Sequence, residues 1–270
     1  MVDRLGLEFI SVLGMPPPQF VALAAELGVG SVGFAPTPLI GNPHGFPSWD
    51  FREDSALVRA TLAALREHGL RVNLGEGFLI RPGFEMADYG QGMDIMAELG
   101  APRLNAVVIE PDPARALDQF ARFAEMAAAR GLQALLEFMP TTQPGTLDEA
   151  LAFIAASGAT DAKLLIDTMH VFRSGAEIGD FTRIDPSRFG YVQLCDVPMP
   201  ATIVEYTEEA SHERLCPGDG DLPLAQLLHA LPDDLVIGLE VPMVSKARAG
   251  IGLYEALAPC VAAARRLLAA

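Results

Sequence analysis

The stretch that decides the fold runs from residue 132 to 167 and reads LQALLEFMPTTQPGTLDEALAFIAASGATDAKLLID. It begins and ends with short, nearly continuous apolar runs, which are typical of strands covered on both faces in a parallel sheet. Between them lies an amphipathic helix pattern that ends in Gly158. A strand, a helix and a second strand in this order predict one right-handed βαβ unit.

The same unit recurs along the whole chain. Eight such repeats favour a closed (β/α)8 TIM barrel over an open doubly wound sheet, which usually has fewer strands. No strand–GxGxxG–helix signature for a dinucleotide opens the chain. We therefore predict a single α/β barrel domain over residues 1–270. The apolar runs expected to form its strands are 5–13, 31–35, 70–75, 103–109, 132–138, 162–167, 189–195 and 234–241.

Composition narrows the class of protein. The net charge of −16 and the pI of about 4.6 argue against nucleic-acid binding, because such a field repels phosphates. No apolar run is long enough for a membrane helix, and the N-terminus lacks the pattern of a signal peptide. The sequence thus predicts a cytoplasmic protein, in which Cys195, Cys216 and Cys260 are expected to be reduced.

Four consecutive predicted strands end in a residue with an oxygen donor. In a TIM barrel these strand ends meet at the catalytic face. Three carboxylates in an apolar mouth would repel one another unless a cation held them. Hard oxygen donors suit Mn²⁺ or Mg²⁺ better than Zn²⁺. The expected metal ligands are Glu137, Asp167, Gln193 and Glu240.

The seventh strand leaves an alternative open. Side chains alternate along a strand, so an inward Gln193 implies that Cys195 also faces inward and that Asp196 turns away. Gln193 is favoured as the ligand, and Asp196 is the competing candidate.

Other polar residues are candidates for contact with a substrate. In LLIDTMHVFRSG (164–175), His170 and Arg173 lie one helical step apart and are expected to share a face above the metal. His170 could shuttle a proton, and Arg173 could hold a carbonyl or carboxylate oxygen. Arg214 either reaches the site or pairs with Glu205 or Glu213. Further candidates are Glu76, and His44 and Trp49 in the Pro- and Gly-rich segment 36–51.

Five segments resemble the xylose isomerase-like TIM barrel superfamily of sugar isomerases and epimerases. The Asp-x-x-His pair and the Pro-Gly-x-Gly segment lie in the family's order between two strand-end glutamates. The resemblance implies a divalent metal and proton transfer by Glu137 and Glu240. The family usually has His where this chain has Gln193, although some members, including 3-dehydroshikimate dehydratases, have Gln. The segments are LLEFMP, LLIDTMHVFRSG, YVQLCDVP, RLCPGDGDLPL and GLEVPM.

These observations predict a metal-dependent isomerase or epimerase of a small polyhydroxylated carbonyl compound. Proton abstraction beside the carbonyl would be the first step, with Glu137 or Glu240 as base. The main alternative is a lyase of the 3-dehydroshikimate dehydratase type, and a second is a non-catalytic sugar-binding barrel. The dehydratases carry a His shortly after the first glutamate, and this chain has none there. A homo-oligomer is compatible with the sequence.

Overall fold

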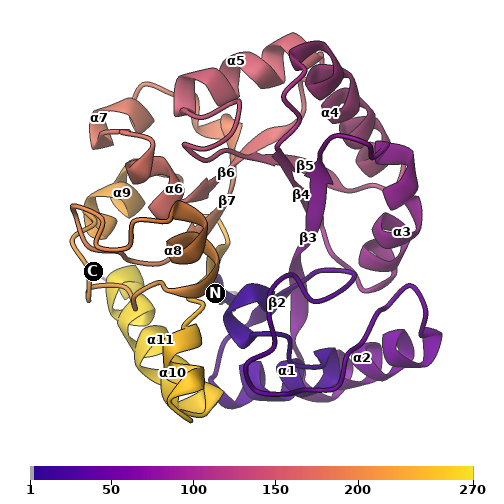
Figure 1. The fold of residues 1–270 in the computed structure, drawn as a ribbon, viewed down its shortest axis with the longest axis vertical. Coiled ribbons are helices and arrows are strands. Elements are labelled where there is room, and N and C mark those ends of the chain that lie inside the picture. Colours follow the sequence, from indigo (N-terminus) through magenta and orange to yellow (C-terminus); the bar gives the residue numbers. More distant parts are fainter. Residues whose placement is uncertain (1–2, 270) are drawn as a thin grey trace.

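The computed structural model describes residues 3–269 and confirms the predicted barrel. Eight parallel strands pair in sequence order, and β8 closes the barrel on β1 (Figure 1). Each predicted apolar run overlaps one strand. The strands are β1 (Leu5–Leu7), β2 (Ser31–Phe34), β3 (Arg71–Ile80), β4 (Arg103–Val108), β5 (Gln133–Glu137), β6 (Lys163–Asp167), β7 (Phe189–Leu194) and β8 (Ile237–Leu239).

Helices surround the strands, and several begin and end at the residues that the sequence indicates. Asp54 caps α2 by accepting hydrogen bonds from two backbone N–H groups, and Gly69 ends it in the left-handed conformation. The α-helices are α1 (Pro17–Glu26), α2 (Ser55–His68), α3 (Gly90–Glu98), α4 (Pro113–Ala128), α5 (Leu147–Ser157), α6 (Thr168–Arg173), α7 (Ile178–Phe181), α8 (Tyr206–His212), α9 (Leu224–Ala230), α10 (Val244–Arg248) and α11 (Leu253–Ala269).

The first and third strands differ in length from their apolar runs. β1 stops at Leu7, and residues Phe9–Val12 form a short 3-10 helix, η1. β3 continues through Gly77 to Ile80, past the predicted end at residue 75. Gly77, inside this strand, adopts a positive φ, a conformation that is unfavourable for residues with a side chain. Glycine usually interrupts a strand pattern, so the hydrophobic pattern alone could not place the end of β3.

The barrel interior is layered, and this layering positions the polar residues. Leu74, Leu135, Leu165 and Tyr191 form a separate apolar cluster inside the barrel. Because side chains on a strand alternate between its two faces, the residue two positions further along each strand points to the same interior. Those four residues lie above the apolar layer, two of them at the last position of a strand. They are Glu76, Glu137, Asp167 and Gln193.

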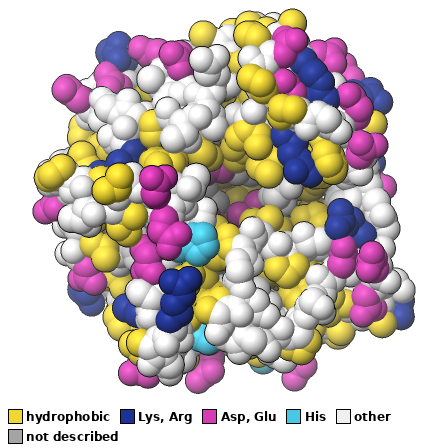
Figure 2. Space-filling model, in the orientation of Figure 1, with side chains coloured by type: hydrophobic (Ala, Val, Ile, Leu, Met, Phe, Trp, Pro, Cys, Tyr) yellow, Lys and Arg dark blue, Asp and Glu magenta, His cyan; other side chains and the backbone are white. Residues whose placement is uncertain are grey.

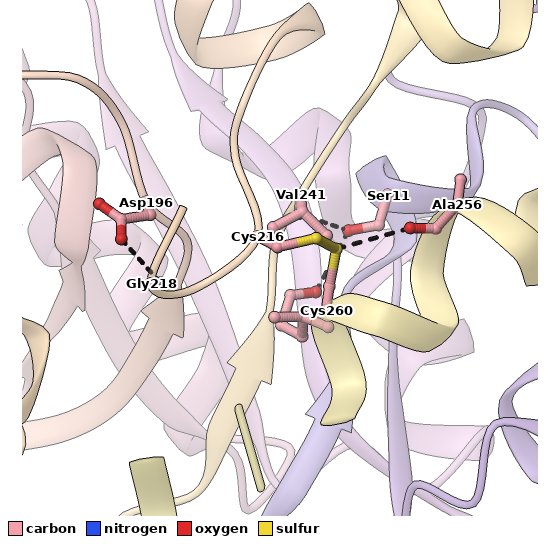
Figure 3. The surroundings of a disulfide bond; sticks show 8 residues. Ser11, Asp196, Cys216, Gly218, Val241, Ala256 and Cys260 are labelled. Atoms are coloured by element: carbon pink, nitrogen blue, oxygen red, sulfur yellow. Dashed lines mark hydrogen bonds between the residues drawn. A yellow bond between two sulfur atoms is a disulfide. The ribbon is translucent and has the colours of Figure 1, made fainter. Parts of the chain in front are cut away.

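The expectation of three reduced cysteines is wrong for two of them. Cys216, in the loop after α8, forms a disulfide with Cys260 of α11 (Figure 3). Cys195 is free and buried. No local pattern indicates the pair, because the two cysteines are 44 residues apart and only the folded chain brings their Cα atoms to 4.6 Å. Disulfides are uncommon in the cytoplasm, so this bond does not support the predicted cytoplasmic location. That location stays a prediction.

We expect thiol titration to detect this bond directly. Unfolded but unreduced protein should show one reactive thiol, that of Cys195, and reduction should raise the count to three. Losing the cross-link between Cys216 and Cys260 should also lower the free energy of unfolding by about 2–4 kcal/mol, measured by urea denaturation with and without reductant. Three reactive thiols before reduction would contradict the bond.

Among the residues that the structure describes, no helix is both long and apolar enough to cross a bilayer.

Candidate active site

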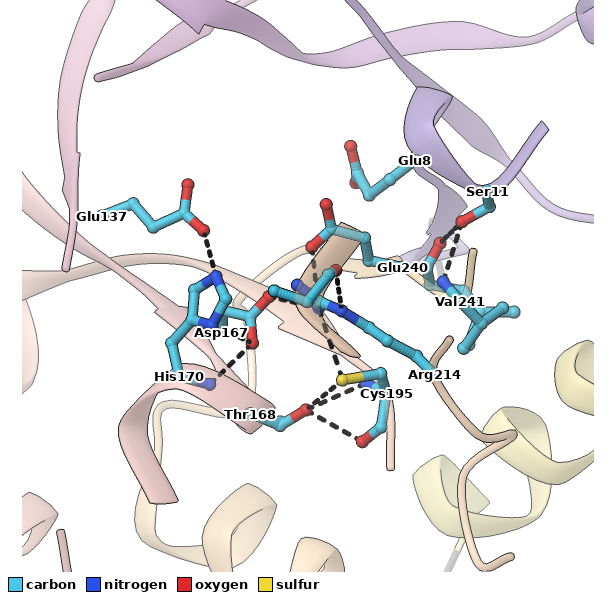
Figure 4. A network of polar contacts seen from close by, with 12 residues as sticks. Glu8, Ser11, Glu137, Asp167, Thr168, His170, Cys195, Arg214, Glu240 and Val241 are labelled. Carbon is cyan, nitrogen blue, oxygen red and sulfur yellow. Dashed lines mark hydrogen bonds and ion pairs between the residues drawn. The ribbon is translucent and has the colours of Figure 1, made fainter. Parts of the chain in front are cut away.

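Buried carboxylates gather at the carboxyl end of the barrel. Figure 4 shows Glu137, Asp167, Glu240 and Glu8 around one space, and Figure 2 shows acidic side chains at the bottom of the central hollow. Glu8 follows β1 and Glu240 follows β8, so they come from strands that are neighbours in the barrel. All four residues are at most 8 % exposed. Burial of this much like charge requires compensating cations or protons.

Glu137, Asp167 and His170 form the group best suited to hold a metal ion. One potential ligand atom from each lies within 4.8 Å of the others. The Nε2 atom of His170 is 3.3 Å from Oε1 of Glu137. Asp167 caps α6, because its Oδ1 accepts a hydrogen bond from the backbone N–H of His170 at 3.0 Å. The Asp-x-x-His spacing therefore places this imidazole beside the acids.

The imidazole of His170 is held from both sides. Its Nδ1 lies 2.5 Å from the hydroxyl of Tyr206, on α8, and its Nε2 faces Glu137. Asn105 also donates a hydrogen bond to Oε2 of Glu137 at 2.5 Å. Partners of this kind fix the orientation of a ligand or a base before a substrate arrives. No sequence pattern indicates Tyr206, which begins the short helix α8.

Arg214 is the main cation of the site. Its NH1 nitrogen lies 2.5 Å from Oδ2 of Asp167 and 3.2 Å from Oε2 of Glu240, and its side chain is buried. Of the two arrangements expected from the sequence, the structure shows the one in which Arg214 reaches the site. Its backbone N–H donates to the carbonyl of Pro242, which follows Glu240 and ties this loop to the end of β8.

The pKa values of the two carboxyl groups that contact Arg214 are shifted in opposite directions, although Arg214 lowers both. Burial alone would raise the pKa of Asp167, but the nearby guanidinium of Arg214 and the hydrogen bonds around it hold that pKa well below its usual range. For Glu240, burial dominates, and the neighbouring carboxylates of Asp167 and Glu137 add to it. Its pKa is therefore raised well above the usual value despite Arg214. The surroundings thus favour the charged form of Asp167 more than that of Glu240.

The two candidate metal ligands of the seventh strand, Gln193 and Asp196, have different hydrogen-bond partners. Gln193 is buried and its Oε1 atom has no hydrogen-bond partner within the described chain. Asp196 instead accepts hydrogen bonds from the backbone N–H groups of Val197, Gly218 and Leu222, so both its oxygens serve the loop after β7 (Figure 3). A free, buried carbonyl oxygen is the kind of donor that a hard cation completes.

Other candidates from the sequence lie outside this contact network. Arg173 binds Glu209 through two hydrogen bonds of 2.7 and 2.9 Å and lines an open groove between α4 and α5. It does not share the surroundings of His170, although both belong to α6. Trp49 donates to the carbonyl of Gly14 and packs against Phe9, while the ring of His44 lies near Phe46.

Glu8, a fully buried acid after β1, is not among the site residues expected from the sequence. Tyr191 donates a hydrogen bond to Oε1 of Glu8, whose carboxylate lies against Gly238 of β8 and Gly33 of β2. Oε1 of Glu76 also lies beside Gly33. Burial raises the pKa of Glu8 to about 7, opposed by the hydrogen bond from Tyr191. The signal was present, because Glu8 is the single charged residue in the apolar run 5–13.

This shift predicts a pH dependence of stability for the metal-free protein. Because the pKa of Glu8 is higher in the folded than in the unfolded chain, folding takes up a proton, and its stabilising contribution is complete below about pH 4.5. The contribution falls by about 1.4 kcal/mol per pH unit as the pH rises toward 7. Urea unfolding of wild type and Glu8→Gln at several pH values measures it. Equal slopes for the two proteins would refute the assignment.

The donor set fits a divalent metal ion. Glu137, Asp167 and His170 have converging ligand atoms, and the orphaned carbonyl of Gln193 supplies a further oxygen. Two of the expected ligands, Asp167 and Glu240, are paired with Arg214. Several divalent ions bind carboxylate as well as imidazole ligands, so these donor types do not select one metal.

Comparison with known proteins agrees with the fold. A family model described as xylose isomerase-like TIM barrel matches residues 21–257, and the chain belongs to this family. No curated protein matches the sequence. A solved structure of IolI protein with a bound zinc atom has a TM-score of 0.79 and 13 % identity, over 98 % of each chain.

Two further solved structures are similar. A D-psicose 3-epimerase with D-tagatose from Clostridium cellulolyticum H10 has a TM-score of 0.72 and 15 % identity, over 98 % of this chain and 99 % of the other. A xylose isomerase-like TIM barrel/4-hydroxyphenylpyruvate dioxygenase fusion protein has a TM-score of 0.72 and 17 % identity. That match covers 93 % of this chain but only 42 % of the fusion protein. At these identities the structural likeness establishes the fold alone.

Proposed function

We propose that this protein is a divalent-metal-dependent isomerase or epimerase of a small polyhydroxylated carbonyl compound. The observation that carries the proposal is the buried group of Glu137, Asp167 and His170 at the catalytic end of a barrel from the xylose isomerase-like family. The solved relatives that contain zinc or D-tagatose support a metal and a ketose as the kinds of ligand to test. Mn²⁺ or Mg²⁺ is the ion we expect.

The metal would be held by Glu137, Asp167, Gln193 and Glu240, with His170 as a further donor in reach of the first two. When bound, a divalent ion supplies Lewis-acid polarisation of the substrate carbonyl. The remaining work belongs to the protein. Oε2 of Glu137 is held by Asn105, which orients this carboxylate to take the proton from the carbon next to the carbonyl. Glu240 is the second glutamate that can exchange a proton.

Arg214 and His170 would orient the substrate. The guanidinium of Arg214 is fixed over Asp167 and Glu240 and can hold a substrate oxygen through a remaining N–H group. His170, supported by Tyr206, can donate to a second oxygen or pass a proton to Glu137. The apolar barrel wall excludes water from both, which strengthens these interactions.

Proton exchange in D₂O tests the proposal. Candidate ketoses and keto acids are incubated with the metal-stripped protein and with protein reloaded with Mn²⁺, and NMR follows deuterium at the carbon next to the carbonyl. We expect exchange only with metal, and conversion to an isomer or epimer. A new ultraviolet absorbance from a conjugated product would instead indicate the dehydratase alternative. Ligand binding without exchange in any reloaded sample would contradict an enzymatic role.

A further inference from the structure

Two short helices at the carboxyl end of the barrel, α6 and α8, are joined by side chains at two levels (Figure 1). His170 and Arg173 are three residues apart on α6, and Tyr206 and Glu209 are three residues apart on α8. Residues at this spacing share one face of a helix. The hydroxyl of Tyr206 meets Nδ1 of His170 at 2.5 Å, and Arg173 meets Glu209 one helical step further on. The first contact belongs to the candidate site, and the second lies outside it.

The outer contact, between Arg173 and Glu209, is a two-point ion pair. Nε and Nη2 of Arg173 donate to the two carboxylate oxygens of Glu209 at 2.9 and 2.7 Å, an arrangement that fixes orientation as well as distance. The Arg173 side chain is 10 % exposed and that of Glu209 is 2 % exposed, so solvent screens the pair little. Nη2 also donates to the carbonyl of Pro198 at 2.8 Å. One guanidinium therefore holds both ends of the segment 198–209.

The position of α8 depends on such contacts with other elements. The helix has seven residues, too few to be stable by itself, and the preceding residues 197–205 form neither helix nor strand. Of its neighbouring glutamates, Glu205 and Glu208 are exposed, and Glu209 alone is buried. Within residues 3–269, Tyr206 and Glu209 are the two α8 side chains that form a hydrogen bond or ion pair with another element.

We propose that Arg173 and Glu209 are positioning residues that dock α8 on α6 and thereby hold Tyr206 against His170. This inference rests on the proposed function, in which His170 orients the substrate or passes a proton. The charged groups of Arg173 and Glu209 are bonded to each other, so neither is assigned a contact with substrate. Their effect on the reaction passes through Tyr206 to the imidazole.

Arg214 follows α8 but has anchors of its own. Its backbone N–H donates to the carbonyl of Pro242, and the next residue, Leu215, exchanges two backbone hydrogen bonds with Asp196. These bonds keep the Arg214 loop in place when α8 moves. Loss of the ion pair between Arg173 and Glu209 therefore acts on the site through Tyr206.

Amide hydrogen exchange measured by mass spectrometry tests the docking of α8 without substrate or metal. In Glu209→Gln, peptides covering residues 205–213 should exchange at least about tenfold faster than in wild type, because a buried ion pair has lost one partner and the helix opens locally. The matched control is Glu208→Gln, the same change at the neighbouring exposed glutamate, whose partner His212 lies within α8. This control should leave the exchange of α8 unchanged.

A second control separates local opening from general destabilisation. Glu110 is also buried and pairs with Arg115 of α4 at 2.9 Å, so Glu110→Gln should accelerate exchange in α4 and leave α8 at the wild-type rate. If Glu209→Gln does not fold, Arg173→Lys provides the test, because it keeps the positive charge but loses the two-point geometry. Unchanged exchange of α8, or equal acceleration throughout the chain, would overturn the inference.

Turnover of the Mn²⁺-loaded protein tests the route through Tyr206. Tyr206→Phe and Glu209→Gln should each slow exchange of the substrate proton by roughly 10- to 100-fold, since both leave His170 poorly held. The double variant should be no slower than the slower single variant, because both changes remove the same support. Effects that multiply in the double variant would contradict this route. Absence of exchange in wild type would refute the proposed function and the catalytic part of this inference, whereas amide exchange would still decide whether the pair docks α8.

Discussion

Glu137→Gln should lower the rate of substrate proton exchange by roughly 10²–10⁴-fold, the usual contribution of a general base. An amide at this position cannot accept the proton from carbon. It also removes one charge from the group of Glu137, Asp167 and His170, so affinity for Mn²⁺ should fall. Deuterium incorporation measured by NMR gives the first effect, and calorimetric titration with Mn²⁺ gives the second.

The control for Glu137→Gln is the melting temperature of the metal-free protein. The variant should be at least as stable as the wild type, because it buries one fewer charge beside Asp167. Full exchange activity in a folded Glu137→Gln protein would place the base elsewhere, and Glu240 would be the first residue to test. Lost activity together with lost folding would have to be resolved with Glu137→Asp, which keeps the carboxylate.

Arg214→Met should be the most damaging substitution for stability. It removes the one guanidinium that contacts both Asp167 and Glu240, and it leaves Asp167 buried without its main cation. Breaking a buried ion pair from one side costs about 3–5 kcal/mol. Urea unfolding of the metal-free variant measures this loss. Added Mn²⁺ should recover about 2.7 kcal/mol at a concentration one hundred times its dissociation constant.

A matched comparison for this experiment is Arg52→Met. Arg52 also pairs with an aspartate, Asp50, at 2.7 Å, but its side chain is 47 % exposed. An exposed pair contributes about 0–1 kcal/mol, so this variant should unfold near the wild-type midpoint and show no response to Mn²⁺ beyond that of wild type. Equal losses for Arg52→Met and Arg214→Met would contradict the part assigned to Arg214.

The barrel could be predicted from the sequence because its determinants are local. Runs such as 132–138 and 162–167 are apolar throughout, and helix ends such as Asp54 and Gly69 carry their own capping chemistry. These signals act over a few residues, so they survive without knowledge of the fold. They also located Glu137 and Asp167 at strand ends, since strand alternation and barrel topology together determine which residues face inward.

Tertiary structure alone decided which polar groups meet. Arg214 reaches Asp167 across 47 residues of sequence, Tyr206 reaches His170 across 36, and Tyr191 reaches Glu8 across 183. Arg173 lies one helical step from His170, yet binds Glu209, and Cys216 pairs with Cys260 instead of remaining reduced. The sequence determined that acids would line a barrel mouth. Their partners depended on loop paths and on space left by Gly33 and Gly238, and neither is encoded in a local pattern.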